Sequence, residues 1–293
     1  MERYEKIKKA SILGIVGNVF LLVIKAIVGF MTHSQSMIAD ASNSAGDIFS
    51  SLMTFIGNRI SSRPRDKDHN LGHGKADYVY SMLISLVMMV MCYDVCKGAI
   101  KSLIVKGEYE FSFWLIVVCF TTIAVKFGLF LYTHYLSKKY NSILIEANAM
   151  DHRNDCIITT CNLIANICAL NGIYFIDGIV GIGISVWIFI TAVDIFKKSY
   201  DVLMDKSVSK ETKEKVYRII NSHEEIKKVK HFNSTPVGYR YQVSFTIYVD
   251  GSMSTYDSHK IADDLEKEIA EKVEEIYLTV IHVNPIKLEK DIK

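Results

Sequence analysis

Two aspartates one helical turn apart are the residues of this chain whose chemistry most needs an explanation. Asp151 and Asp155 lie within an otherwise apolar stretch, and a second pair, Asn43 and Asp47, lies within another. A carboxylate at the centre of a membrane helix costs roughly 2.5–3.5 kcal/mol on insertion scales. A chain keeps such groups at i, i+4 spacing only if something stabilises them, so the spacing indicates a site for a divalent cation.

Each pair belongs to a polar stripe that follows one helix face, at about 100° per residue. Two helices with such stripes are expected to face each other or a water-filled cavity rather than lipid. An interhelical hydrogen-bond seam would explain the serines, threonines and asparagines, but converging carboxylates would repel each other without a cation. The stripes consist of Asp40, Ser44, Asp47, Ser51, Thr54 and Asn58, with Asn43 at the edge, and of Asn148, Asp151, Asp155, Thr159, Asn162 and Asn166.

The two pairs offer oxygen ligands, which favour a hard cation. Asp47, Asp151 and Asp155 supply carboxylates, and Asn43 supplies a neutral carbonyl oxygen. Such ligands suit Mg²⁺, Mn²⁺ and Ca²⁺ and tolerate Fe²⁺, whereas zinc sites generally use nitrogen or sulfur. His152 lies about 100° from Asp151 around the helix, so we do not expect it to be a ligand, although it could approach the site.

Long apolar segments must position these residues. The chain has 293 residues, of which 50% are hydrophobic, and the apolar runs end near residue 195. A spanning helix needs about 20 apolar residues, and six segments qualify; the fifth is kept for its length and because an even number of crossings is expected. The predicted spans are Ala10–Phe30, Ser36–Gly57, Tyr78–Ile100, Phe111–Leu136, Ile143–Leu170 and Ile173–Val193.

Two lysines lie within these predicted spans. Lys25 falls in the first span and Lys126 in the fourth. We expect them either to extend towards the membrane surface or to pair with acids such as Asp94 or Glu146.

Basic residues predict the orientation of the spans, because cytoplasmic loops carry an excess of lysine and arginine. They gather at the N-terminus, after the second and fourth spans and at the end of the sixth, so both termini are expected in the cytoplasm. The net charge of only +2 argues against a nucleic-acid partner. The basic residues are Arg3, Lys6, Lys8, Lys9, Arg59, Arg63, Arg65, Lys67, Lys75, Lys138, Lys139, Lys197 and Lys198.

The C-terminal part predicts a small ferredoxin-like α+β domain of order α-β-β-α-β. Its second helix carries Ile261, Leu265 and Ile269 four residues apart, facing a sheet. We therefore predict an α-helical transmembrane domain over residues 1–204 and a separate domain over residues 205–293. The predicted elements are Lys210–His223, Lys228–Ser234, Tyr239–Asp250, Ser254–Val273 and Tyr277–Val283, with the last strand closed by Asn284-Pro285.

The motifs resemble those of the cation diffusion facilitator family over nearly the whole chain. In that family the second and fifth spans each carry two metal ligands at i, i+4 that end in Asp, as at Asp47 and Asp155. The surrounding sequence also matches, in Ile38-Ala-Asp40-Ala-Ser-Asn43-Ser-Ala-Gly-Asp47, Gly72-His73-Gly74-Lys75-Ala76 and Asp151-His-Arg-Asn-Asp155. The resemblance implies six spans followed by a cytoplasmic regulatory and dimerisation domain.

The departures from the family pattern resemble its manganese-exporting branch. Zinc-transporting members typically place His first in the fifth-span pair, and His or Asp first in the second-span pair. This chain has Asp151 and Asn43 there, so it lacks the nitrogen donor that zinc prefers. The resemblance thus implies Mn²⁺ as the transported ion, with Fe²⁺ and Zn²⁺ as alternatives, and Asp151→His is expected to shift transport towards Zn²⁺.

The resemblance also implies accessory sites. Asp66, His69 and His73 match a second metal site of some members, with a solvated loop as the alternative. Lys75 matches a lysine that pairs with an Asp at the start of the tail, here Asp205. The tail positions that bind metal in zinc-type members match His231, His259 and His282, but the further positions carry Thr246 and Asn284, which puts a tail site in doubt.

The function implied is that of a homodimeric antiporter in the plasma membrane, which exchanges Mn²⁺ for protons by alternating access. Coupled protonation of the carboxylates would release the ion. An intramembrane aspartyl protease is a rival from another class, but paired ligands on each span fit metal coordination better than a catalytic dyad. A passive channel is a second rival, and channels use weak serial sites rather than a compact cage.

Overall fold

The computed structural model describes residues 2–32, 35–104, 113–170 and 175–286, and the chain divides into two compact units. The first unit contains residues 1–63 and 76–200, and the second contains residues 64–75 and 201–293. The short segment 64–75 therefore belongs with the tail, although it lies between two long helices in the sequence.

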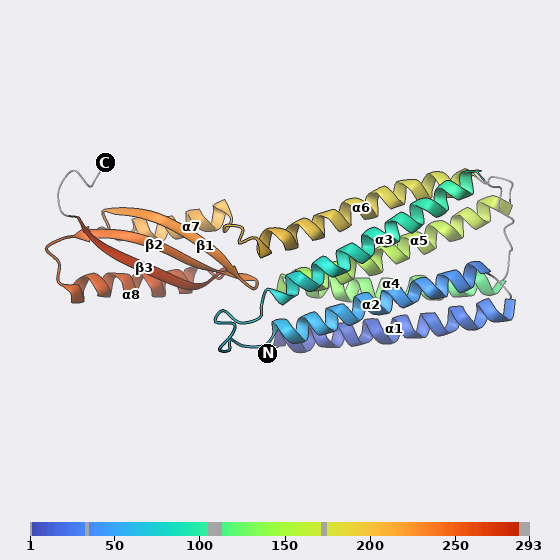
Figure 1. Ribbon diagram of the computed structural model, residues 1–293, viewed down its shortest axis with the longest axis horizontal. Helices are drawn as coiled ribbons and strands as arrows, with labels where there is room; N and C mark the ends of the chain where they lie inside the picture. The colour runs from blue at the N-terminus through green and yellow to red at the C-terminus, as the bar shows by residue number, and fades with distance from the viewer. Residues whose placement is uncertain (1, 33–34, 105–112, 171–174, 287–293) are drawn as a thin grey trace. The chain divides into compact units, whose positions relative to one another are not determined.

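Six long helices form the first unit, at the positions of the six predicted spans (Figure 1). Among the described residues, α1, α3 and α4 are long and apolar enough to cross a membrane. The helices are α1 (Glu2–Thr32), α2 (Gln35–Ser61), α3 (Ala76–Ile104), α4 (Phe113–Tyr140), α5 (Ile143–Leu170) and α6 (Phe175–Leu203). The predicted spans began inside several of these helices, because the helices continue beyond their apolar runs into charged ends.

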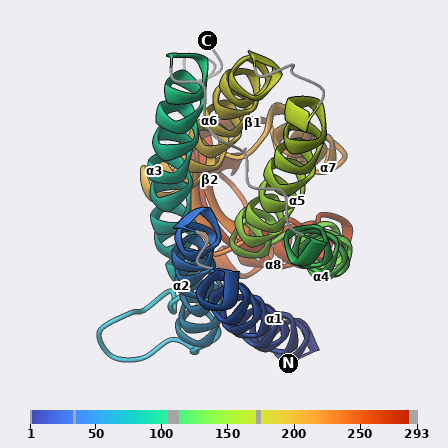
Figure 2. The ribbon, with the colours of Figure 1, turned by 90° about the vertical axis from the view of Figure 1, so that its right-hand side faces the viewer.

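The packing order brings the two polar helices together. α1 packs against α2 and α4, and α5 packs against α3, α4 and α2 (Figure 2). One apolar core contains Ile84 and Met88 of α3, Leu144 of α5 and Ile195 of α6. Because α2 contacts α5, the stripe residues Asp47, Asp151 and Asp155 lie buried inside the bundle.

An ion pair and a hydrogen bond tie several helix ends together at one end of the bundle. Arg3 at the start of α1 lies 2.5 Å from Asp77 at the start of α3. The hydroxyl of Tyr140, at the end of α4, donates to the carboxylate of Glu2 at 3.1 Å. The basic clusters at these ends therefore lie on the same side of the unit.

The second unit is a three-stranded sheet covered by two helices, in the predicted order. Its elements are α7 (Lys210–Asn221), β1 (Lys228–Val237), β2 (Arg240–Asp250), α8 (Thr255–Lys272) and β3 (Ile276–Ile286). The central strand β2 pairs antiparallel with β1 and parallel with β3. Alternate residues of β2, including Val243 and Phe245, pack with Ile220 of α7 and Leu265 of α8, so both helices cover one face.

Both outer strands run further than predicted, through a proline. β1 continues past Ser234 through Pro236, and β3 continues past Val283 through Pro285. Proline lacks an amide donor and is tolerated where a strand has a free edge. The expectation that Asn284-Pro285 ends the last strand is wrong, because β3 is an edge strand and β2 still pairs with it at Pro285.

Candidate functional site

Three helices bring two carboxylates and one ammonium together inside the first unit. Lys126 Nζ of α4 donates to Asp47 Oδ2 of α2 at 2.7 Å and to Asp155 Oδ2 of α5 at 2.5 Å. All three side chains are buried, and Lys126 is fully so. A buried charge is tolerated when it is paired, so the lysine and the two acids stabilise one another.

Helix α1 fixes the position of the α2 acid. The amide of Asn18 donates to the backbone carbonyl of Asp47 at 3.0 Å and to the hydroxyl of Ser51 at 3.1 Å. Gly14 allows the same close approach, because a Cβ there would meet Ser51 Oγ at 2.9 Å. These contacts hold the polar stripe of α2 turned inward.

Two acids of the α5 stripe and the neighbouring His152 complete the cluster. Asp151, His152 and Asp155 offer ligand atoms that all lie within 4.8 Å of one another, and all three are buried. Asp151 Oδ2 and both ring nitrogens of His152 have no hydrogen-bond partner among the described residues. A buried polar atom without a partner is costly, so this group is suited to a cation. His152 lies closer to the carboxylates than its position around the helix suggested.

The partner acids proposed from the sequence are wrong for Lys126. Lys126 pairs with Asp47 and Asp155, while Lys25 donates to the hydroxyl of Ser44 at 3.1 Å. Glu146 lies at the end of the bundle, where Lys198 of α6 reaches it at 3.4 Å. The side chain of Asn43, the remaining predicted ligand, lies outside the described side chains, as does that of Asp40.

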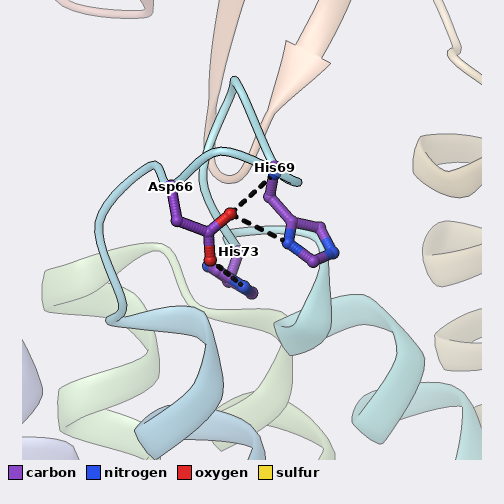
Figure 3. Close-up of side chains that lie close together, drawn as sticks. All are labelled: Asp66, His69 and His73. Carbon is purple, nitrogen blue, oxygen red and sulfur yellow. Dashed lines mark hydrogen bonds and ion pairs between the residues drawn. The ribbon is translucent and has the colours of Figure 1, made fainter.

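A second cluster of ligand types lies in segment 64–75 of the second unit (Figure 3). Asp66 lies 3.2 Å from His69 Nδ1 and 3.5 Å from His73 Nε2, and the two imidazole rings are 4.3 Å apart. Hydrogen bonding by the backbone amide of His69 holds the pKa of Asp66 below its ordinary value of 3.8. The carboxylate is therefore ionised at neutral pH and the three predicted residues can share one cation.

The same segment is anchored to the start of the tail and to the β1–β2 turn. Lys75 Nζ donates to Asp205 Oδ1 at 2.7 Å, the pair expected from the sequence. Gly74 packs directly on Gly238, whose φ of 63° lies in the left-handed region. Glycine is needed at the turn because other residues rarely adopt that conformation.

The three tail histidines are exposed and lie on different elements. His231 is in β1 at the bulge before Asn233, His259 is on α8, and His282 is in β3 opposite Thr246 of β2. None of the three belongs to a group of metal-binding side chains among the described residues. A tail metal site therefore stays a prediction.

Two family models match consecutive parts of the chain. The cation efflux transmembrane domain matches residues 11–204, and the cytoplasmic domain of cation efflux proteins, a dimerisation domain, matches residues 208–286.

Curated relatives from Bacillus subtilis match over nearly their whole length. The manganese efflux system protein MneP is 26% identical over 97% of this chain and 98% of its own, and MneS is 28% identical over 98% and 99%. The uncharacterised transporter YdbO is 30% identical over 97% of this chain and 99% of its own.

Proposed function

Since this chain belongs to the cation efflux family, which carries metal ions and is not a family of enzymes, we propose that it exports Mn²⁺ from the cell in exchange for protons. The observation that carries this proposal is the meeting of Asp47 and Asp155 around Lys126, with Asp151 beside them. Carboxylate oxygens are ligands that Mn²⁺ accepts. We propose Asn43 as the fourth ligand, because it lies one turn before Asp47 in α2.

We prefer manganese to zinc because the first ligand of the α5 pair is Asp151. Asp151 offers oxygen where an imidazole would favour zinc, and two relatives carry manganese efflux in their names. Zn²⁺ and Fe²⁺ remain the alternatives, since His152 places an unpartnered nitrogen near the carboxylates.

The substitution Asp151→His tests the choice of metal. It supplies an imidazole on the same helix face, so we expect Zn²⁺ uptake into vesicles to rise relative to Mn²⁺ uptake. The same substitution at exposed Asp194 is the matched control and is expected to leave the ratio unchanged. An unaltered ratio in Asp151→His would contradict the role given to this residue.

The proposed arrangement in the membrane is six spans, with domains over residues 1–204 and 205–293 and both termini in the cytoplasm. The basic clusters share one end of the bundle, and basic residues favour the cytoplasmic side. The dimerisation domain at residues 208–286 supports a homodimer, and we propose the plasma membrane as its location. Asp66, His69 and His73 are proposed as a second metal site.

Proton coupling follows if metal and protons compete for the same neighbouring carboxylates. Because protons on these acids weaken metal binding, an acidic receiving side would release the ion. In proteoliposomes an imposed pH gradient should therefore drive Mn²⁺ uptake against its own gradient. Mn²⁺ flux that is indifferent to the pH gradient would remove the coupling and leave transport itself in place.

The protease alternative is disfavoured by the same lysine. An aspartyl dyad requires two carboxylates that share a proton, whereas the Lys126 ammonium separates Asp47 from Asp155. We expect the purified protein to cleave no transmembrane peptide. Cleavage that is lost in Asp155→Ala would favour the protease.

A further inference from the structure

The Lys126 ammonium lies between two carboxylates of the proposed transport site. It takes one oxygen of Asp47 and one of Asp155 at hydrogen-bonding distance. A divalent cation coordinates carboxylate oxygens at roughly 2.0–2.6 Å. The ammonium and the metal therefore compete for the same two oxygens and for the same small buried volume.

The lysine also sets the charge of the empty site. Asp47, Asp151 and Asp155 lie together, and the Lys126 ammonium contacts two of them. Lys25 of α1 donates to the hydroxyl of Ser44 on the same face of α2. Without an ion, Lys126 supplies the positive charge between the helices that the acids require, since like charges in a low-dielectric site repel strongly.

We propose that Lys126 is an internal counter-cation of the transport site, which holds α2 and α5 together when the site is empty and is displaced by the arriving metal. This inference rests on the proposed function and adds a third helix, α4, to the site. The lysine weakens metal binding by competition, and by returning to the acids it promotes release of the ion.

The substitution Lys126→Met tests this role, because methionine keeps much of the length of the side chain and removes its charge. The full-length protein is purified, and Mn²⁺ binding is measured by the paramagnetic resonance signal of the free ion. We expect Lys126→Met to bind Mn²⁺ about 10- to 100-fold more tightly, the factor that corresponds to one of the two charge-assisted hydrogen bonds that the metal would otherwise have to break. Mn²⁺ release from preloaded proteoliposomes should become slower.

Two further variants separate charge from packing. Lys126→Arg keeps the positive charge and should bind Mn²⁺ with nearly wild-type affinity. Lys198→Met removes an ammonium outside the site, one that pairs with Asp194 and Glu146, and should leave the affinity unchanged. Unchanged or weaker Mn²⁺ binding in Lys126→Met, beside a wild type that binds and transports Mn²⁺, overturns the inference. A wild type that neither binds nor transports Mn²⁺ counts against the proposed function instead.

A structure of the wild-type protein with Mn²⁺ bound gives an answer even if Lys126→Met does not fold. We expect Nζ to have left the hydrogen-bonding distance of at least one of Asp47 and Asp155. An ammonium that still bonds both carboxylates beside the bound ion would refute displacement.

Discussion

The contact between Gly74 and Gly238 should be intolerant of a single added methyl group. A Cβ at Gly74 would lie 2.7 Å from Gly238 Cα and 3.1 Å from its backbone nitrogen. Ordinary contact begins at 3.4 Å, so two stretches of backbone would have to separate by about 0.7 Å. Backbone atoms cannot rotate away as a flexible side chain does.

Overpacking of this kind typically costs about 1–3 kcal/mol. We expect Gly74→Ala to release segment 64–75, because the segment is short and the other contact that holds it among the described residues is the exposed pair of Lys75 and Asp205. The Asp66, His69 and His73 cluster would then lose its fixed geometry.

Hydrogen–deuterium exchange of the full-length protein in detergent micelles measures this release. Amide exchange across segment 64–75 and the β1–β2 turn should accelerate about 5- to 150-fold in Gly74→Ala, the factor that corresponds to 1–3 kcal/mol. Gly98→Ala is the control, since a Cβ there meets nothing within 4 Å. Equal protection of segment 64–75 in both variants would refute the steric argument.

Three other outcomes follow from the second unit. The turn at Asp66 should stay closed from neutral pH down through 3.8 and open only as the pH falls through the lowered pKa of the folded state, because its hydrogen bonds from His69 require the carboxylate. Amide exchange measured against pH tests this. The variant Asp66→Asn should abolish the pH dependence. Lys75→Ala should lower the free energy of unfolding by no more than about 1 kcal/mol, since the pair with Asp205 is exposed; a loss above this range in chemical unfolding would argue for a stronger coupling. Leu265→Ala should lower it by about 2–5 kcal/mol, because the side chain is fully buried against the sheet; a tail that unfolds at the wild-type denaturant concentration would contradict this.

The order of the elements could be predicted because each carries a local signal. The apolar runs predicted helices at all six positions, and the strand predicted over Tyr239–Asp250 is β2. The ends of the outer strands could not be predicted, since Pro236 and Pro285 are acceptable only at an edge, and pairing decides which strands are edges.

The candidate site was only partly predictable for a similar reason. Angular position on a helix indicated which residues share a face, and Asp47, Asp151 and Asp155 are buried near one another in the structure. It carries no information about which helix lies opposite, so the pairing of Lys126 with two of these acids was missed. A lone lysine in the middle of an apolar helix was the available signal, because such a charge requires a buried partner.

The assignment of segment 64–75 shows another limit of sequence reasoning. The segment lies between α2 and α3 in the sequence, and its contacts group it with the tail. The contact of Gly74 with Gly238 and the pair of Lys75 with Asp205 join positions that are far apart in the sequence. Such contacts depend on the folded geometry of the tail.

Metal-resolved transport by the purified protein tests the central claim most directly. Wild type, Asp155→Ala and the exposed control Asp194→Ala are reconstituted in proteoliposomes, and uptake of Mn²⁺, Fe²⁺ and Zn²⁺ is measured under the same pH gradient. The proposed site predicts that wild type and Asp194→Ala take up Mn²⁺ ahead of the other two ions, and that Asp155→Ala takes up none above empty vesicles. Mn²⁺ uptake by Asp155→Ala at the wild-type rate would contradict the site, and wild-type uptake of Zn²⁺ ahead of Mn²⁺ would contradict the choice of metal.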